Sequence, residues 1–461
     1  MKLVKLSLVT IVIASMASSS FAADTLADAF KNGKVSGELR AWYFDKDTEK
    51  LDTQNVTMNG VTYKLPKGVG DDTAKTGNIL NTVAILNYVT DTFYGFNLGA
   101  TFQASAAPFV DAEGKTAYAS DMYGSGAVLS EAYLGYTIGK TNAKIGRQYI
   151  ATPLVNGSGS RIVRESFEGA TIVNTDIPST TLIAGFVDKF QTRTSYQTKG
   201  DLGGDAPSFN KRAIFNGVSA SDTYQFDDAY TIAVINKSIS HLALTAQYAT
   251  VGDVVAANTE NVNLYYTDAN YVLPMNGFKL GFYLNYRGSK TDLRSGAVNN
   301  VDTVYYDGSQ TAARISISEL AGFGLAVTAA TNSKDDAVIA GMGNGAASST
   351  ATLVKASSPS LRANTDSYRI DLTYDFSKLG VTGLKSILQY AEANQDRVKQ
   401  ATTSADYTSY AGGISYDVPV LKGLSLELIY EKQEVETTRY SNNTKYDWDL
   451  NELRFKANYK F

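Results

Sequence analysis

The chain has 461 residues, with 42 Lys and Arg, 46 Asp and Glu, a single His, no Cys and a formal net charge of -4 at pH 7. Without cysteine it cannot form disulfides, thiolate nucleophiles, iron–sulfur clusters or Cys-ligated zinc sites, and one histidine excludes the usual multi-histidine metal sites. The slightly acidic balance offers no basic surface for counterion release, so we expect no nucleic-acid partner.

The N-terminal segment has the pattern of a secretory signal peptide. Two lysines open it, an uncharged apolar run follows over residues 6–14, and Ala22 ends a cleavage site of small residues. The apolar run is shorter than the ~20 residues that a membrane-spanning helix needs, which argues against an N-terminal anchor. We therefore expect residues 1–22 to be a cleaved signal peptide and residues 23–461 to form one domain.

The rest of the chain alternates apolar and polar residues with the period of β-strands. In residues 451–461, for example, Leu453 and Phe455 share one face, whereas Arg454 and Lys456 share the other. A helix would mix these two sets. About eighteen such runs have the ~10-residue length of a tilted membrane strand. They begin near Lys34, Ile79, Gly95, Ser130, Asn142, Phe167, Thr180, Ala229, His241, Asn261, Phe278, Ala312, Phe323, Asp366, Leu384, Thr408, Leu424 and Asn451.

The connections between these runs alternate in length. Short links such as residues 139–141, 274–277 and 320–322 carry turn residues, whereas long polar stretches separate the other neighbours. This asymmetry is typical of an outer-membrane barrel with short periplasmic turns and long extracellular loops. We therefore predict an all-β fold, a transmembrane antiparallel β-barrel of about 18 strands.

Two other all-β folds fit the sequence less well. A soluble sandwich would divide so long a chain into several linked domains, and a solenoid would repeat at a fixed spacing; we find neither linkers nor such a repeat. The chain also has 30 Tyr and 19 Phe, many near strand ends, as in Tyr43 and Tyr430. Aromatic residues at strand ends are typical of the girdles at a membrane interface.

A barrel of this size is too wide for side chains alone to fill, so inward-facing residues and loops would control what passes. If the apolar face of each strand contacts lipid, the charged residues of the opposite face line the lumen. Arginines there can pass anions along the wall, while carboxylates orient them or attract cations; simple ion pairing along the wall is the alternative for any single residue. The predicted lumen charges are Glu38, Arg40, Lys279, Arg287, Arg314, Arg369, Asp371, Asp375, Glu427, Arg454 and Lys456.

Residues 144–170 carry the most specific local signal. Pro153 ends the pairing of one strand, the next begins at Phe167, and two glycines between them permit a tight bend. Gly146-Arg147-Gln148, Pro153, Arg161 and Phe167-Glu168-Gly169 resemble the third-loop motif of the OprD-like family of bacterial outer-membrane porins.

The resemblance implies an eighteen-stranded diffusion porin whose third loop, near residues 151–166, folds into the barrel and forms the constriction. The stretch between Pro153 and Arg161 lacks the acidic residue that the family pattern would place there, which leaves the preferred solute open. Arg147 shares a face with Ile145, and a bulge near the strand end would turn it inward. The constriction residues implied by the resemblance are Asn156, Ser158, Ser160, Arg161, Arg164 and Glu165.

We therefore expect a porin of a Gram-negative outer membrane that passes small hydrophilic solutes and ions, with no catalytic, cofactor-binding or metal-binding residues. An enzyme would need a proton acceptor near neutral pKa, and His241 lies beside a short turn, on the wrong rim for a surface-facing site. A surface adhesin or structural barrel without an open pore is the alternative that the long loops leave open. A homotrimer would be compatible with a barrel of this size.

Overall fold

The computed structural model describes residues 23–49, 53–58, 61–66, 76–199, 205–218, 223–255, 259–295, 304–354, 359–399, 401, 403–440 and 444–461. The predicted signal peptide lies outside the described residues. Among the described helices, none is both long enough and apolar enough to cross a membrane.

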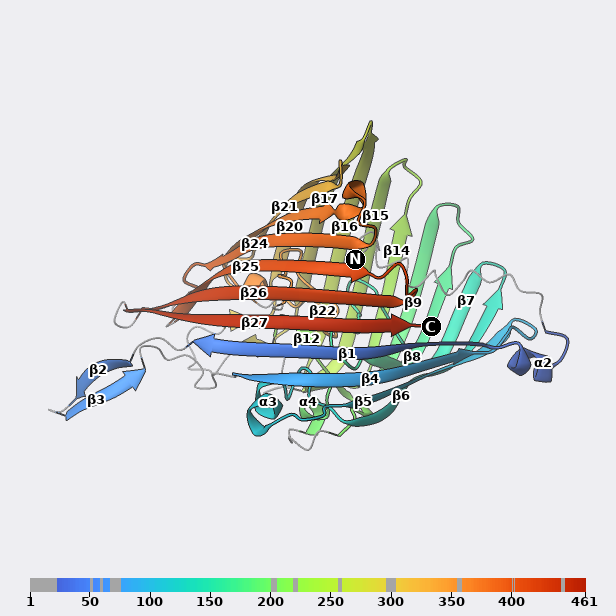
Figure 1. The fold of residues 1–461 in the computed structure, drawn as a ribbon, viewed down its shortest axis with the longest axis horizontal. Helices are drawn as coiled ribbons and strands as arrows, with labels where there is room; N and C mark the ends of the chain where they lie inside the picture. Colours follow the sequence, from blue (N-terminus) through green and yellow to red (C-terminus); the bar gives the residue numbers. More distant parts are fainter. Residues whose placement is uncertain are drawn as a thin grey trace.

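Eighteen long antiparallel strands form the wall of one closed barrel (Figure 1). In chain order they are β1 (Lys34–Glu49), β4 (Gly77–Val89), β5 (Phe96–Ala106), β6 (Gly126–Ile138), β7 (Thr141–Gln148), β8 (Ser166–Asn174), β9 (Thr180–Gln191), β14 (Ala229–Asn236), β15 (Leu242–Val255), β16 (Thr259–Met275), β17 (Phe278–Lys290), β20 (Ser309–Leu320), β21 (Phe323–Asn332), β23 (Thr365–Asp375), β24 (Leu384–Gln395), β25 (Thr403–Asp417), β26 (Leu424–Arg439) and β27 (Thr444–Lys460). Each pairs with its neighbours in the chain, and β1 pairs with β27 to close the wall.

The predicted strands are confirmed, and the boundaries differ mainly at the loop ends. β25 begins at Thr403 rather than near Thr408, and β27 begins at Thr444 rather than near Asn451. In β27 the apolar residues change face between the two parts of the strand, from the even positions Trp448 and Leu450 to the odd positions Leu453 and Phe455, so the pattern of the last segment does not extend back to Thr444. The backbone nevertheless continues to pair, up to Arg439 of β26 opposite Thr444 of β27.

The outer face of the wall shows the alternation most clearly. Val35 and Ile145 are each 62% exposed on this face, as expected for side chains that contact lipid. Towards the loop ends, Tyr43 donates a hydrogen bond to Asp45 over 3.5 Å, and Tyr430 donates one to Asn451 over 3.0 Å. In each pair the polar partner lies closer to the loops than the tyrosine does. Such pairs mark the boundary between hydrocarbon and water.

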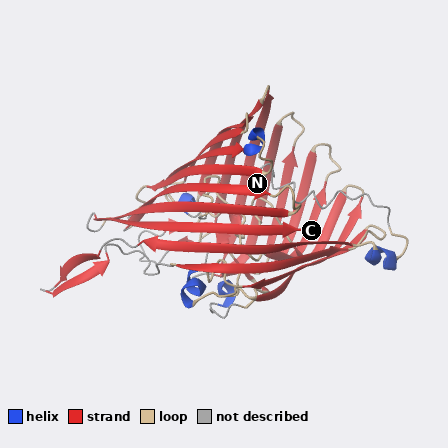
Figure 2. Ribbon diagram, viewed as in Figure 1, coloured by secondary structure: helices blue, strands red, loops and turns tan. Residues whose placement is uncertain are grey.

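The remaining elements are short segments in the connections, where the few helices also lie (Figure 2). The short strands are β2 (Thr53–Met58), β3 (Val61–Pro66), β10 (Phe209–Asn210), β11 (Arg212–Ala213), β12 (Phe215–Asn216), β13 (Tyr224–Gln225), β18 (Arg294–Ser295), β19 (Val304–Tyr305) and β22 (Gly341–Met342). The helices are α2 (Leu26–Lys31), α3 (Ala112–Ala117), α4 (Tyr196–Lys199), η1 (Pro359–Leu361) and η2 (Phe376–Leu379). We number the long connections in chain order and refer below to L2 (107–125), L3 (149–165), L4 (192–228) and L7 (333–364).

The inner face of the wall carries two apolar clusters that hold the loops inside the barrel. In the larger one, Leu154 of L3, Phe215 of L4 and Met342 of L7 are fully buried against wall residues such as Phe190 and Leu264. The smaller cluster joins L2 and L3 to the inner face of β1, β4 and β6. The loops are therefore part of the folded core, and they narrow the lumen.

Candidate pore constriction

Polar side chains on the inner wall, mostly uncharged, bind the backbone of the in-folded loops. Gln103 of β5 accepts a hydrogen bond from the Arg164 N–H over 2.9 Å, and Gln247 of β15 accepts one from the Leu154 N–H over 2.9 Å. The backbone of L7 is bound in the same way by Gln310, Asn332, Gln389 and Glu431. A buried loop is stable only when its polar backbone groups have partners, and the wall supplies them.

L3, L4 and L7 also pair with one another. Phe215 of β12 lies opposite Met342 of β22 in an antiparallel pair, and Val155 forms a bridge with the same Met342. The Met342 N–H donates to the Leu154 carbonyl over 2.8 Å, while the Asn156 N–H donates to the Met342 carbonyl over 2.9 Å. These contacts join three loops into one unit. L3 therefore packs against the inner face of the wall together with L4 and L7, and the sequence did not predict that these two loops accompany it.

Glu165 was expected to line the pore, and the structure corrects this prediction. Its side chain is fully buried, with one carboxylate oxygen accepting from the Ser158 and Asn344 N–H groups over 2.8 and 3.0 Å. The other oxygen accepts from the Asn344 side-chain amide over 2.5 Å and pairs with Arg193 Nε at 3.2 Å. Glu165 therefore lies behind the water-filled path, where it connects L3, L4 and L7.

Arg161 lies beside a carboxylate that comes from another loop. Its Nε is 3.3 Å from Asp121 of L2, and Asp121 is also 3.3 Å from Arg193 Nη1. Burial opposes ionisation of Asp121, but Arg161, Arg193 and Lys46 hold the pKa of this carboxyl well below its usual range. The stretch between Pro153 and Arg161 contains no acidic residue, and Asp121 of L2 provides the carboxylate partner of Arg161 instead.

Three of the other predicted constriction residues mainly stabilise the loop. Asn156 donates its side-chain amide to the Gly345 carbonyl of L7 over 2.9 Å. Ser158 is buried, and its hydroxyl is 2.9 Å from that of Ser160, which is exposed. Of these three side chains, Ser160 is the one that water reaches freely.

Arg164 differs from the other constriction residues because its charge has no carboxylate partner. Its guanidinium carbon lies 3.9 Å from the centre of the Tyr149 ring, and its side chain is partly exposed. The Arg164 carbonyl accepts hydrogen bonds from Gln103 and Gln191, which fixes the backbone. Burial lowers the pKa of Arg164, but an arginine remains protonated at neutral pH. No described carboxylate forms an ion pair with it.

The strand alternation places all eleven predicted lumen charges on the inward face. On β17, for example, Asn285 and Arg287 are buried inside, whereas Leu284 and Tyr286 are about half exposed outside. Most of the cations have a carboxylate partner. The ion pairs are Arg40 with Glu38 (3.0 Å), Arg369 with Asp371 (3.0 Å), Arg454 with Glu452 (2.9 Å), Lys456 with Glu427 (2.7 Å), Lys279 with Glu319 (2.7 Å) and Asp375 with Lys385 (3.8 Å).

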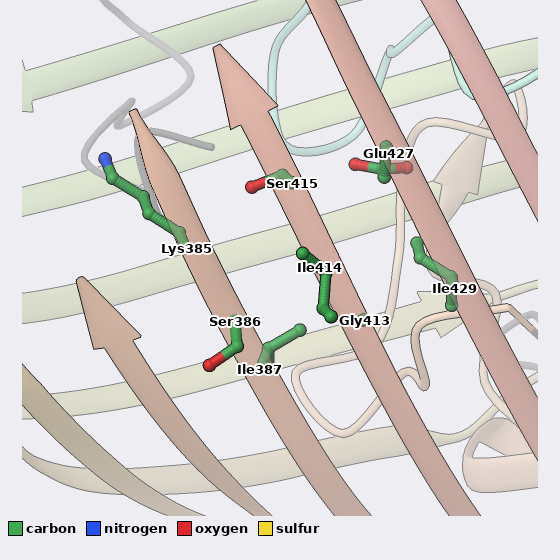
Figure 3. A pocket seen from close by; sticks show the side chains of 8 residues that line it. All are labelled: Lys385, Ser386, Ile387, Gly413, Ile414, Ser415, Glu427 and Ile429. Carbon is green, nitrogen blue, oxygen red and sulfur yellow. The ribbon is translucent and has the colours of Figure 1, made fainter. Parts of the chain in front are cut away.

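The inner wall has a small hollow at Gly413 of β25, which has no side chain (Figure 3). A Cβ at Gly413 would lie 3.2 Å from both Ile387 and Ile429, so these two side chains close over the glycine. Lys385 and Glu427 flank the hollow on the adjacent strands. The hollow lies four residues along β26 from Glu431, which binds L7, so it belongs to the wall below the loops and not to the constriction.

Arg147 keeps the outward face that it shares with Ile145. The register of β7 is continuous with both neighbours, so the expected bulge is absent from this strand. Arg147 Nε pairs instead with Glu168 of β8 at 2.9 Å, and Glu168 also pairs with Lys189 of β9.

Four residues of the constriction escaped the sequence analysis: Asp121, Tyr149, Arg193 and Asn344. Three of them lie in long polar loops without local periodicity, where nothing marks one residue over another. Tyr149 directly follows β7, and its aromatic ring at a strand end was the one signal that could have drawn attention to it. The described residues contain no group of acidic or histidine side chains that could hold a metal ion.

Comparisons with known proteins agree with this geometry. A family model described as outer membrane porin, OprD family, matches residues 91–461. No curated protein matches the chain.

Solved structures of porins from Pseudomonas aeruginosa share the fold. OccK9 (OpdG) is 15% identical with a TM-score of 0.69, over 94% of this chain and 100% of that chain. OccK1 (OpdK) is 13% identical with a TM-score of 0.68, and OpdL is 17% identical with a TM-score of 0.64, each over 94% of this chain and 99% of that chain. The family match supports an open channel over the alternative of an adhesin or closed barrel. The chain belongs to the OprD family and is an outer-membrane diffusion porin.

Proposed function

We propose that this porin favours small anionic solutes, and that Arg164 is the constriction residue that attracts them. The observation that carries the proposal is the unpaired guanidinium of Arg164 over the Tyr149 ring. An anion that passes this point meets a guanidinium that forms no ion pair with a described carboxylate, and a fixed charge in a narrow passage selects by sign.

The other charges of the constriction sum to zero. Arg161 and Arg193 contribute two positive charges, and Asp121 and Glu165 contribute two negative charges, all within one set of ion pairs. A solute outside this set therefore meets little net charge from it. This balance leaves Arg164 as the determinant of sign.

Carboxylates are the solute class that fits this site best. A guanidinium binds a carboxylate through two parallel hydrogen bonds, and the Arg164 side chain is partly exposed. One of the structural neighbours, OpdK, was crystallised with vanillate, an aromatic carboxylate. A small monocarboxylate is therefore the solute to test first.

Bilayer recordings in a salt gradient test the proposal. Wild-type protein should show stable conductance steps with a reversal potential on the anion side, and Arg164→Gln should move that potential towards zero. Arg147→Gln is the matched control, because it removes an arginine from the outward face of β7. An unchanged reversal potential in Arg164→Gln would remove the assignment.

Two earlier expectations remain proposals. We propose that residues 1–22 are cleaved on export, which N-terminal sequencing of the mature protein checks. We also retain a homotrimer as a proposal, to be checked by light scattering of the detergent-solubilised protein. Tyr118 and Met122 of L2 are buried in the chain's own barrel, so a trimer would have to associate without these L2 side chains.

A further inference from the structure

We propose that Glu165 is a positioning residue that fixes L3, L4 and L7 as one rigid constriction and prevents Arg193 from adding its charge to the pore. The part that concerns charge rests on the anion preference proposed above. The part that concerns rigidity does not depend on it.

The Glu165 carboxylate is held by three hydrogen bonds and one ion pair. It accepts hydrogen bonds from the Ser158 N–H, the Asn344 N–H and the Asn344 side-chain amide, and it forms an ion pair with Arg193 Nε at 3.2 Å. Both carboxylate oxygens are therefore engaged. Because the side chain is fully buried, water cannot replace a lost partner.

These partners come from three different loops. Ser158 lies in L3 together with Glu165 itself, Arg193 lies in L4, and Asn344 lies in L7. The chain separation between Glu165 and Asn344 is 179 residues, so no local turn brings them together. A single charged side chain thus connects all three loops. The other contacts between these loops include apolar packing, backbone pairs and the Asn156 hydrogen bond to Gly345, which joins L3 to L7 alone.

The Glu165 carboxylate also controls a charge. Arg193 lies between Glu165 and Asp121, and its side chain is 6% exposed. Asp121 is shared with Arg161, so without Glu165 two guanidinium groups would compete for one carboxylate. The constriction would then carry one additional positive charge.

Glutamine cannot replace this carboxylate. An amide has the same shape, but its NH₂ group would face N–H donors instead of accepting from them. With the NH₂ group in place of Oε1, the hydrogen bond from the Asn344 amide and the ion pair with Arg193 would be lost. In Glu165→Gln we therefore expect the loops to move relative to one another. Single-channel records should show at least a threefold rise in open-channel current noise. The anion-to-cation permeability ratio should rise about fivefold in 0.1 M salt, as estimated for one unit charge near the path.

Glu168→Gln is the matched control. Glu168 is three residues further along the chain, but its ion pairs within the described part of the structure are with Arg147 and Lys189 of the wall and not with L4 or L7. This variant should have wild-type noise and selectivity. Heat-modifiable migration in gels should first show that both variants are folded. Wild-type noise in Glu165→Gln would overturn the proposal.

A disulfide tether separates the mechanical role from the electrical one. Val155 and Met342 form a bridge between L3 and L7, which places their Cα atoms roughly 5 Å apart, within disulfide range. The natural sequence contains no cysteine, so the two introduced residues can pair only with each other within the chain. In Glu165→Gln carrying Val155→Cys and Met342→Cys, oxidation should return the noise to within twofold of wild type while the permeability ratio stays raised. Noise that is unaffected by oxidation would count against the rigidity role.

Asn344→Ala provides a second test if Glu165→Gln does not fold. This variant removes the side-chain amide that donates to Glu165 and leaves the charges intact. The current noise should therefore rise while the permeability ratio stays unchanged. Wild-type noise in a folded Asn344→Ala protein would also overturn the proposal. If wild-type protein shows no anion preference, the proposed function fails, whereas the noise and tether comparisons still decide the role of Glu165.

Discussion

Replacing Asp121 with asparagine should make the channel more anion-selective. Asp121 is within 3.3 Å of both Arg161 and Arg193, in a set of four charges whose sum is zero. The amide keeps the shape of the side chain and one acceptor oxygen but removes the negative charge. The set would then carry one net positive charge, next to the unpaired Arg164.

The size of the effect follows from Coulomb's law. An ion passing at about 5 Å from a unit charge in water gains or loses about 0.8 kcal/mol. At 0.1 M salt the screening length is about 10 Å, which reduces this to about 0.5 kcal/mol. The sign is opposite for anions and cations, so the permeability ratio changes by about 1 kcal/mol, or about fivefold. At 1 M salt the screening length is about 3 Å, and the change falls to less than about twofold.

The assay is the reversal potential in a potassium chloride gradient, measured at low and at high mean concentration. The double variant Asp121→Asn with Arg161→Gln is the matched control, because it removes one charge of each sign and restores the zero sum. Its permeability ratio should stay within about 1.5-fold of wild type, by the same estimate. An unchanged ratio in the single variant at 0.1 M salt would refute the reasoning, as would an equal shift in the double variant.

Two further predictions concern stability and assembly. Because Arg161, Arg193 and Lys46 outweigh the effect of burial and depress the pKa of Asp121, its carboxylate stabilises the fold above the unfolded pKa of about 4, and that contribution is lost as the pH falls further. The melting temperature of the wild-type protein, measured by heat-modifiability, should therefore exceed that of Asp121→Asn by a constant margin from pH 7 to about 5. Below about pH 4 the margin should shrink. A margin that changes between pH 7 and 6 would contradict this. Deleting Phe461 should lower the folded yield, because its N–H and carbonyl exchange hydrogen bonds of 3.1 and 2.9 Å with Gly37 across the closing seam of β1 and β27; a normal amount of heat-modifiable barrel would argue against that role.

The wall could be predicted from the sequence because its signal is local. Residues two apart share a face, so Leu284 and Tyr286 identify the lipid side of β17 and Arg287 follows on the inner side, with no knowledge of the neighbouring strands. The strand ends near Thr403 and Thr444 were missed because backbone pairing continues there although the apolar set of the membrane-facing segment does not.

The constriction could not be predicted in the same way, because it depends on loops that meet only after the barrel has closed. Asp121 and Arg193 are 72 residues apart in the chain, and no spacing rule connects them. Sequence patterns also identified Glu165 by its position in the third loop but gave no information about burial. Three hydrogen bonds and one ion pair, with groups from three loops, hold this carboxylate away from the water.

The anion preference proposed above depends on where ion pairs are missing and not on the total of the lumen charges. Among the arginines predicted to face the pore, Arg164, Arg287 and Arg314 form no ion pair with any described carboxylate, and each lies near a tyrosine ring, at 3.9, 5.5 and 4.9 Å from its centre. A ring stabilises a guanidinium through its quadrupole but carries no net charge, so the positive charge is not cancelled. A carboxylate partner, as in the pair of Arg40 and Glu38, also stabilises the arginine, but its negative charge cancels the electric field of the arginine at longer distances. Stacking on tyrosine thus allows an arginine to be held in place within the wall while its charge still attracts a passing anion.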